Sequence, residues 1–179
     1  MKRIIILTFT LVMALTGFSK DYKVENLKKI TKGNFKITRL LILTDSLVEP
    51  EINKFIEDFT LTLKTEFENN NLMFLCIRKG MSPIKDFHIN FENLHPDGIM
   101  EFSPSYHFIW YKGFYQKTCL SFKVNLSYRT LGVEKFTHLF TTRIGVTIDS
   151  FEKSAIPTAH ELFKKMVEDG YLSINEKSN

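Results

Sequence analysis

The chain has 179 residues, a formal charge of +4, and 44% hydrophobic and 25% charged residues. Two of its cations, Lys2 and Arg3, lie in the opening segment, so the remainder carries +2 with both signs interspersed. This balance lacks the clustered Lys and Arg of a nucleic-acid-binding surface, so no nucleic-acid partner is expected. The length fits one domain that buries its core without metal or disulfide support, and we expect no cofactor.

Residues 1–19 have the layout of a secretory signal peptide. Lys2 and Arg3 precede an uncharged apolar run from Ile4 to Phe18, and small residues precede the predicted cleavage before Lys20. A retained anchor is the alternative, but fifteen residues at about 1.5 Å each fall short of a hydrocarbon core of about 30 Å. No cysteine near the cleavage site offers a lipid attachment point. The sequence therefore predicts an exported, periplasmic chain that is soluble after cleavage.

A polar lead-in at residues 20–34 precedes the domain, and we expect one or two helical turns in it. The single domain is predicted over residues 35–174, followed by a tail at residues 175–179. Its first element is a strand at residues 35–43, which is rich in strand-forming residues and ends in a turn-like Thr-Asp-Ser.

An amphipathic helix is predicted to begin near Pro50, whose missing N–H costs nothing in a first helical turn. Apolar residues recur at spacings of three and four and so form one stripe. The stripe consists of Ile52, Phe55, Ile56, Phe59, Leu63 and Phe67. The helix should end at residues 69–71, because asparagine tolerates the left-handed conformation.

The middle of the chain is predicted to be mostly strand. A continuous apolar run at residues 72–77 indicates one strand, and a long loop with an optional short strand follows over residues 78–96. Another strand is expected at residues 99–102, ended by Pro104. From residue 106 to 148 apolar and polar residues alternate, which indicates antiparallel strands with one dry and one wet face.

The last helix is predicted to begin near Ser154 as its N-cap, with Pro157 in the first turn, and to stop at Gly170. Its buried stripe would consist of Ile156, Ala159, Phe163, Met166 and Val167. A short edge strand can follow at residues 171–174. Together the elements predict an α+β fold, with a single mostly antiparallel sheet and two helices packed on one face.

This order of elements resembles small exported envelope domains. The features that carry the resemblance are "RLLILTD", "EINKFIEDFTLTLKTEF", "PDGIMEF", the long hairpin and "SAIPTAHELFKKMVEDGYL". They are similar to the TolB amino-terminal domain, the curli-secretion lipoprotein and the auxiliary lipoproteins of envelope ABC transporters. The resemblance implies partner binding in the cell envelope rather than catalysis. Many of those proteins carry a lipid-anchored cysteine, which this chain lacks.

The segment "YHFIWYKGFY", residues 106–115, places six aromatic residues in ten positions. A tight turn at Lys112-Gly113 would leave Phe108 and Trp110 on an exposed face, whereas a three-residue loop that adds Phe114 would send them to the core. Lysine is unfavourable in a turn that needs positive φ, so the longer loop is favoured. In either register Tyr111, Phe114 and Tyr115 lie near the hairpin end, where they form the predicted partner-contact site.

Catalytic and metal motifs are absent from the sequence, so we predict a non-enzymatic accessory module with a protein partner in the envelope. Peripheral membrane contact and pairing of an edge strand with a second copy are compatible with this prediction. The alternative is a metal-binding protein or enzyme that uses His88, His95 and Asp97 in a polar loop. A carrier of an apolar ligand is a third hypothesis.

The two cysteines, Cys76 and Cys119, leave two alternatives open. In an oxidising compartment they can form one disulfide. Each also sits among apolar residues, so both can be separate thiols that pack as small hydrophobic side chains. Their spacing matches neither a zinc site nor a CxxC motif.

Overall fold

The computed structural model describes one connected set of strands and helices. It covers residues 22–31, 35–45, 50–79, 91–112, 115–129, 136–147, 150–172 and 174, and describes residues 106–112, 115–119 and 152 by backbone alone. The predicted leader and the tail lie outside the described residues.

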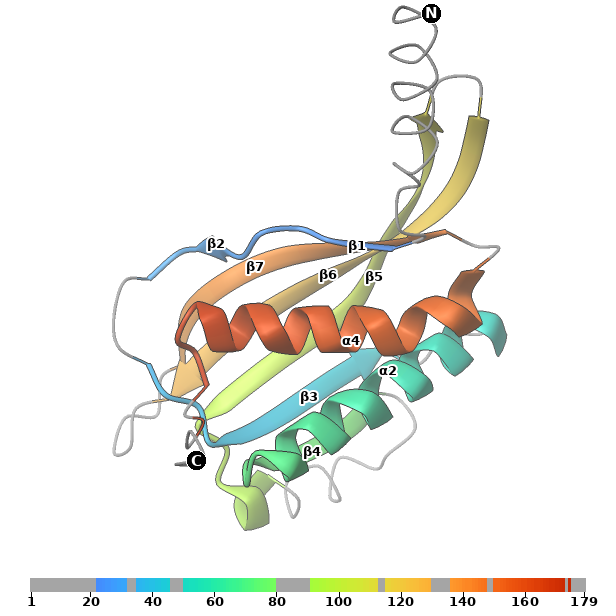
Figure 1. Ribbon diagram of the computed structural model, residues 1–179. Helices are drawn as coiled ribbons and strands as arrows, with labels where there is room; N and C mark the ends of the chain where they lie inside the picture. The colour runs from blue at the N-terminus through green and yellow to red at the C-terminus, as the bar shows by residue number, and fades with distance from the viewer. Residues whose placement is uncertain are drawn as a thin grey trace, which may run out of the picture.

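A seven-stranded mixed sheet forms one layer, in the order β1-β7-β6-β5-β3-β4, with β2 also paired to β7 (Figure 1). The strands are β1 (Tyr22–Val24), β2 (Lys28–Lys29), β3 (Arg39–Asp45), β4 (Met73–Lys79), β5 (Gly98–Lys112), β6 (Tyr115–Arg129) and β7 (Phe136–Thr147). The fold is α+β as predicted, and most strand pairs are antiparallel. Strand β3 is parallel to both β4 and β5, because a helix connects β3 to β4 and returns the chain in the same direction.

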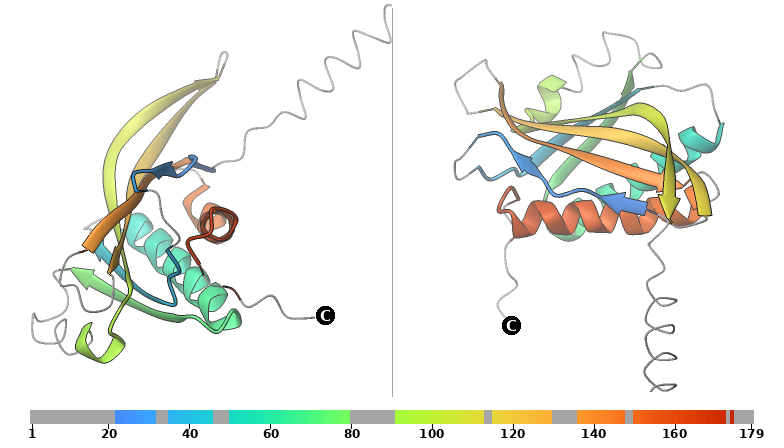
Figure 2. Two further views of the ribbon diagram at one scale, coloured as in Figure 1. Left: turned by 90° about the vertical axis from the view of Figure 1, so that its left-hand side faces the viewer. Right: turned by 90° about the horizontal axis from the view of Figure 1, so that it is seen from above.

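The two long helices are α2 (Pro50–Asn69) and α4 (Phe151–Glu168), and a short helical turn spans residues 91–94. In the views of Figures 1 and 2, α2 and α4 lie next to each other on the same side of the sheet. Their buried side chains and those of β3, β5, β6 and β7 belong to a single hydrophobic cluster.

Stacked phenylalanine rings fill the centre of this cluster. Phe55 and Phe59 from α2 meet Phe102 of β5 and Phe122 of β6, and all four side chains are buried. The ring centroids are 4.7 Å apart for Phe59 with Phe102, 4.7 Å for Phe102 with Phe122, and 5.0 Å for Phe55 with Phe122. The centre of the space between the helices and the sheet is therefore filled by these rings, and the apolar-carrier hypothesis stays a prediction.

Helix α2 confirms its sequence prediction closely. It begins at Pro50, and all six residues of the predicted stripe are buried. The chain leaves the helix through Asn71, whose φ of 57° is the left-handed conformation that asparagine tolerates. The periodicity was readable because one helix face is covered along its whole length.

Helix α4 corrects its prediction in three places. It begins at Phe151 rather than after Ser154, which is buried inside the helix, and Pro157 lies in the interior rather than the first turn. Ile156 is 51% exposed and does not belong to the buried stripe. The end is as predicted, because Gly170 adopts a φ of 76° and the next amide bonds back to Met166, which is a Schellman arrangement.

The lead-in is strand rather than helix. Strands β1 and β2 both pair with β7, so the segment covers an edge that β7 would otherwise expose. The Lys165 side chain of α4 donates a hydrogen bond of 2.6 Å to the Val24 carbonyl. Lys29 of β2 pairs with Asp169 at 3.0 Å, and this hydrogen bond raises the pKa of the Lys29 ammonium. Strands of two and three residues are too short to show alternation in sequence.

Candidate interaction surface on the long hairpin

Strands β5 and β6 extend beyond the rest of the sheet. Their mutual pairing runs out to Lys112 opposite Tyr115, whereas the pairing of β6 with β7 stops at Cys119 opposite Thr147. Strand β3 pairs β5 no further than Phe102. Among the described residues, positions 109–112 and 115–118 therefore pair only with each other, and we call them the distal ribbon. Figures 1 and 2 show this ribbon projecting past the sheet and both long helices.

A β-bulge decides which residues of β5 share a face. Pro104 lies opposite Phe122 but Tyr106 lies opposite Ser121, so Ser105 is the extra residue and the alternation reverses there. Beyond the bulge Phe108 and Trp110 lie at the register positions opposite Cys119 and Lys117. These positions alternate with Leu120, which is buried on the helix side.

The register of β5 with β6 corrects two predictions from the sequence. Pro104 does not end the strand, because β5 continues through it to Lys112. The favoured loop of Lys112, Gly113 and Phe114 is wrong, since Lys112 pairs with Tyr115 and leaves two residues between them. The aromatic residues at 106, 108 and 110 are thus assigned to the face away from the helices, which we call the outer face.

The structure places two of the three predicted contact residues, Tyr111 and Tyr115, at the end of the distal ribbon. Tyr111 pairs with Gln116 and Tyr115 pairs with Lys112, so the two tyrosines occupy positions on opposite faces. Phe114 lies outside the described residues. Their contact with a partner stays a prediction.

Four strands of the sheet carry basic residues and no acidic ones. Strands β1, β2, β6 and β7 contain no Asp or Glu, and their cations are Lys23, Lys28, Lys29, Lys117, Lys123, Arg129 and Arg143. Lys123 of β6 and Arg143 of β7 are exposed and lie directly opposite each other in the register.

A polar network lies on the same face beside this pair. Thr141 donates to the Asn125 side-chain oxygen at 2.9 Å, and its Oγ1 is 3.0 Å from Nε2 of His138. Nδ1 of His138 is 3.4 Å from the Ser127 hydroxyl. The sequence alone does not single out His138, because the irregular register between Leu126 and Ser127 creates this neighbourhood and leaves no trace in the alternation.

Of the predicted metal or catalytic loop, the structure describes only His95 and Asp97. Asp97 is buried, and its carboxylate accepts hydrogen bonds from the Thr38 amide and hydroxyl and from the Arg39 amide. His95 is exposed with a φ of 45°, and His88 lies outside the described residues. Within the part of the chain that the structure describes, no group of three or more His, Cys, Asp or Glu side chains could hold a metal ion.

The cysteine question is constrained by the order of the sheet. Cys76 on β4 is a free cysteine, and burial raises the pKa of its thiol above the ordinary value. Strands β5 and β3 lie between β4 and β6, which carries Cys119. Neighbouring strands are about 4.8 Å apart, so β4 and β6 are separated by three such spacings. That distance between Cys76 and Cys119 exceeds the roughly 7 Å between Cα atoms that a disulfide spans. The disulfide stays a prediction, and the strand order argues against it.

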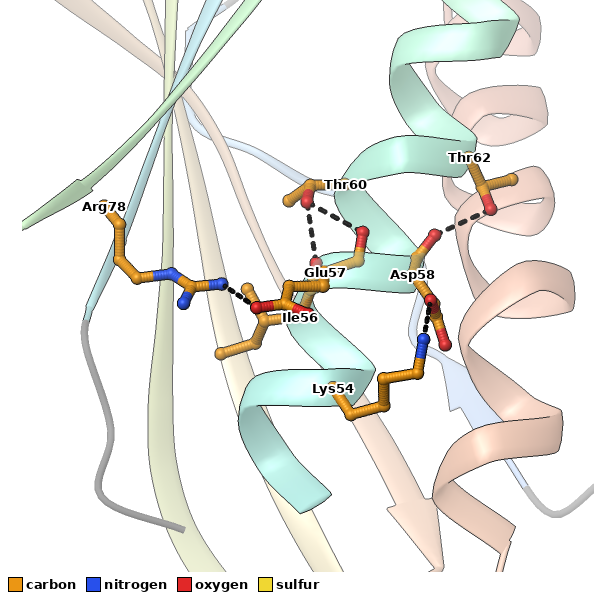
Figure 3. A network of polar contacts seen from close by, with 7 residues as sticks. All are labelled: Lys54, Ile56, Glu57, Asp58, Thr60, Thr62 and Arg78. Atoms are coloured by element: carbon orange, nitrogen blue, oxygen red, sulfur yellow. Dashed lines mark hydrogen bonds and ion pairs between the residues drawn. The ribbon is translucent and has the colours of Figure 1, made fainter. Parts of the chain in front are cut away.

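Polar side chains also connect α2 with β4, as Figure 3 shows. Arg78 of β4 reaches Glu57 of α2 at 3.1 Å, and Lys54 reaches Asp58 at 2.8 Å. The buried Thr60 hydroxyl returns its hydrogen bond to the Ile56 carbonyl at 2.7 Å. Exposed ion pairs and hydroxyls bonded to their own helix are ordinary structural contacts, so this network is no candidate site.

Comparison with known proteins does not place the chain in a family. No protein-family model matches it, and neither does any curated protein sequence. A PelC dodecamer from Paraburkholderia phytofirmans is 7% identical, with 81% of this chain and 97% of that chain covered and a TM-score of 0.47. Lipoprotein GNA1162 from Neisseria meningitidis is 12% identical (73% and 97% covered, TM-score 0.37), and a minor lipoprotein from Acinetobacter baumannii is 10% identical (77% and 98%, TM-score 0.36). Likeness at these values carries no argument about function.

Among the helices in the described part of the chain, none is long and apolar enough to cross a membrane.

Proposed function

We propose that this protein is a non-enzymatic, exported accessory module of the cell envelope, and that it binds a protein partner at the end of its long hairpin. The distal ribbon is the observation that carries the proposal. A two-stranded ribbon outside a sheet is at best marginally stable in water, so contact with a partner would stabilise it. The signal-peptide layout of residues 1–19 supports export.

The composition of the ribbon supports a contact role. Tyr111, Phe114 and Tyr115 form the predicted contact site, and aromatic residues with a polar tip are enriched among the anchors of interfaces. The outer edges of both ribbon strands are unpaired among the described residues, so an extended segment can add to either edge through backbone hydrogen bonds. A strand from a second copy of this chain is one segment that can pair with such an edge.

Site-specific photo-crosslinking tests this proposal. With p-benzoylphenylalanine in place of Tyr111, irradiation of intact cells should give one discrete crosslinked protein, whose mass distinguishes another protein from a second copy. The control places the same group at Leu61, which is 63% exposed on α2, and should give no discrete product. Serine at Phe114 and Tyr115 should abolish the crosslink from position 111 while leaving the melting temperature unchanged.

Two outcomes would contradict the proposal. One is the same product from position 61 as from position 111. The other is an unchanged product in the variant with serine at Phe114 and Tyr115.

A further inference from the structure

Strand β4 forms one end of the sheet, on the side away from β1 and β2 (Figure 1). The β7 side is covered by β1 and β2, whereas among the described residues β4 pairs with β3 alone. The strand opens with the apolar run MFLCI, and its Met73 side chain is 53% exposed. An exposed apolar edge strand without proline or a central lysine favours pairing with another strand.

The backbone hydrogen bonds of β4 indicate which of its residues face the free edge. The Met73 amide donates to the carbonyl of Thr38, which directly precedes β3, at 2.8 Å. Successive residues of a strand direct their N–H and C=O groups to opposite sides. Phe74, Cys76 and Arg78 therefore direct these groups away from β3, toward the free edge.

We infer that β4 pairs antiparallel with β4 of a second copy of this chain, about a two-fold axis at Cys76. This register overlaps the whole strand and sets the edge-facing residues opposite one another, with Cys76 opposite its counterpart and Phe74 opposite Arg78. Such a contact uses the same surface on both copies and closes as a dimer. The inference goes beyond partner binding at the hairpin end and involves no residue of the distal ribbon.

The charges of β4 support antiparallel pairing with a second copy. Its two basic residues, Arg78 and Lys79, lie together at the end of the strand. Parallel pairing would set each cation beside its own counterpart, which destabilises a sheet. Antiparallel pairing instead sets them opposite Phe74 and Met73, whose apolar surface the long aliphatic stems of arginine and lysine can cover.

The last turn of α2 supplies the matching negative charge. This turn contains Glu66 and Glu68 and no basic residue, and the C-terminal end of a helix dipole is itself negative. Phe67 packs on Phe74 with ring centroids 5.5 Å apart, so this turn lies over the start of β4. The proposed register sets Arg78 of the second copy opposite Phe74, and so beside the acidic end of α2.

Cys76 provides a covalent probe of this register. Its side chain is exposed, although neighbouring groups partly desolvate the thiol. Residues opposite each other in a hydrogen-bonded antiparallel pair have Cα atoms about 5.5 Å apart, which a disulfide can span. Diamide should therefore join two Cys76 thiols by an S–S bond, and it takes up the two protons and two electrons that they release.

Analytical ultracentrifugation of the full mature protein under reducing conditions tests the dimer. The unchanged protein should show a concentration-dependent dimer. Cys76→Pro removes one edge-facing N–H and leaves the pairing with β3 intact, so the dimer dissociation constant should rise more than about tenfold. Cys76→Ser is the matched control, because it keeps this N–H and should dimerise like the unchanged protein. A monomer at all concentrations, or equal dimerisation of both variants, would overturn the inference.

A crosslinking test of the register does not depend on the folding of the proline variant. In a background with Cys76→Ser and Cys119→Ser, protein with Met73→Cys is mixed with protein carrying Lys79→Cys and treated with diamide. The mixture should give a disulfide dimer, and neither protein should do so alone. The control is Ile156→Cys on α4, which is 51% exposed in the unchanged chain and should not crosslink to position 73. Equal crosslinking of position 73 to position 156, or to itself, would contradict the register.

Failure here is distinguishable from failure of the proposed function. A crosslink from position 111 that persists while the β4 dimer is absent leaves the partner at the hairpin standing and removes the dimer. A β4 dimer in a protein that gives no crosslink from position 111 does the reverse.

Discussion

Replacing Phe122 by alanine should lower the free energy of unfolding by about 3–5 kcal/mol. The Phe122 ring is fully buried and stacks on Phe55 of α2 and on Phe102 of β5, so its removal opens a cavity where a helix meets two strands. Neighbouring aromatic rings are rigid and collapse poorly into such a space. Urea unfolding followed by circular dichroism measures the change from the shift of the midpoint.

The control for this prediction is Leu61→Ala on α2. Leu61 is 63% exposed, so its truncation should change the free energy of unfolding by no more than about 0.5 kcal/mol. Equal effects of the two substitutions would show that the helix and the sheet do not pack through Phe122.

Replacing Asp97 by alanine should lower the free energy of unfolding by about 2–4 kcal/mol. The Asp97 carboxylate holds the amides of Thr38 and Arg39 at 3.1 and 2.9 Å, and its backbone bonds both to Arg39 and to Arg129. Alanine leaves these part-buried donors without their acceptor at the point where β3, β5 and β6 meet. Thermal and urea denaturation measure the loss.

Asp45→Ala is the matched control, because Asp45 ends β3 with a looser ion pair of 3.9 Å to Lys79. An exposed pair of this kind contributes about 0–1 kcal/mol. If Asp97→Ala left stability unchanged but abolished metal binding, the structural role of Asp97 would be wrong and the metal hypothesis would return.

The helix stripes and the long strands could be predicted because burial of one face requires apolar residues at a regular spacing in the sequence. The predicted apolar stripe of α2, whose six residues are all buried, shows this most clearly. In α4 the periodicity wrongly included Ile156, which precedes Pro157 inside the helix and is exposed. An exposed apolar residue in a helix cannot be distinguished from a buried one by sequence alone.

Features that depend on distant pairing could not be predicted. Strands β1 and β2 exist because β7 offers them an edge, and their own residues carry no strand period. The bulge at Ser105 inserts one residue into the alternation and so exchanges the faces of Phe108 and Trp110. Asp97 was read as part of a polar loop, because its partners Thr38 and Arg39 lie almost sixty residues earlier.

Amide hydrogen exchange on the distal ribbon tests the central claim most directly. Among the described residues, positions 109–112 and 115–118 pair only with each other, and we propose that contact with a partner orders them. In the isolated protein their amides should exchange far faster than those of residues 98–102 and 120–126 in the same two strands. In cell-envelope preparations that contain the proposed partner, the ribbon amides should become protected. Equal protection of both regions in the isolated protein, or no gain of protection in the envelope, would contradict the assignment of the hairpin as the contact surface.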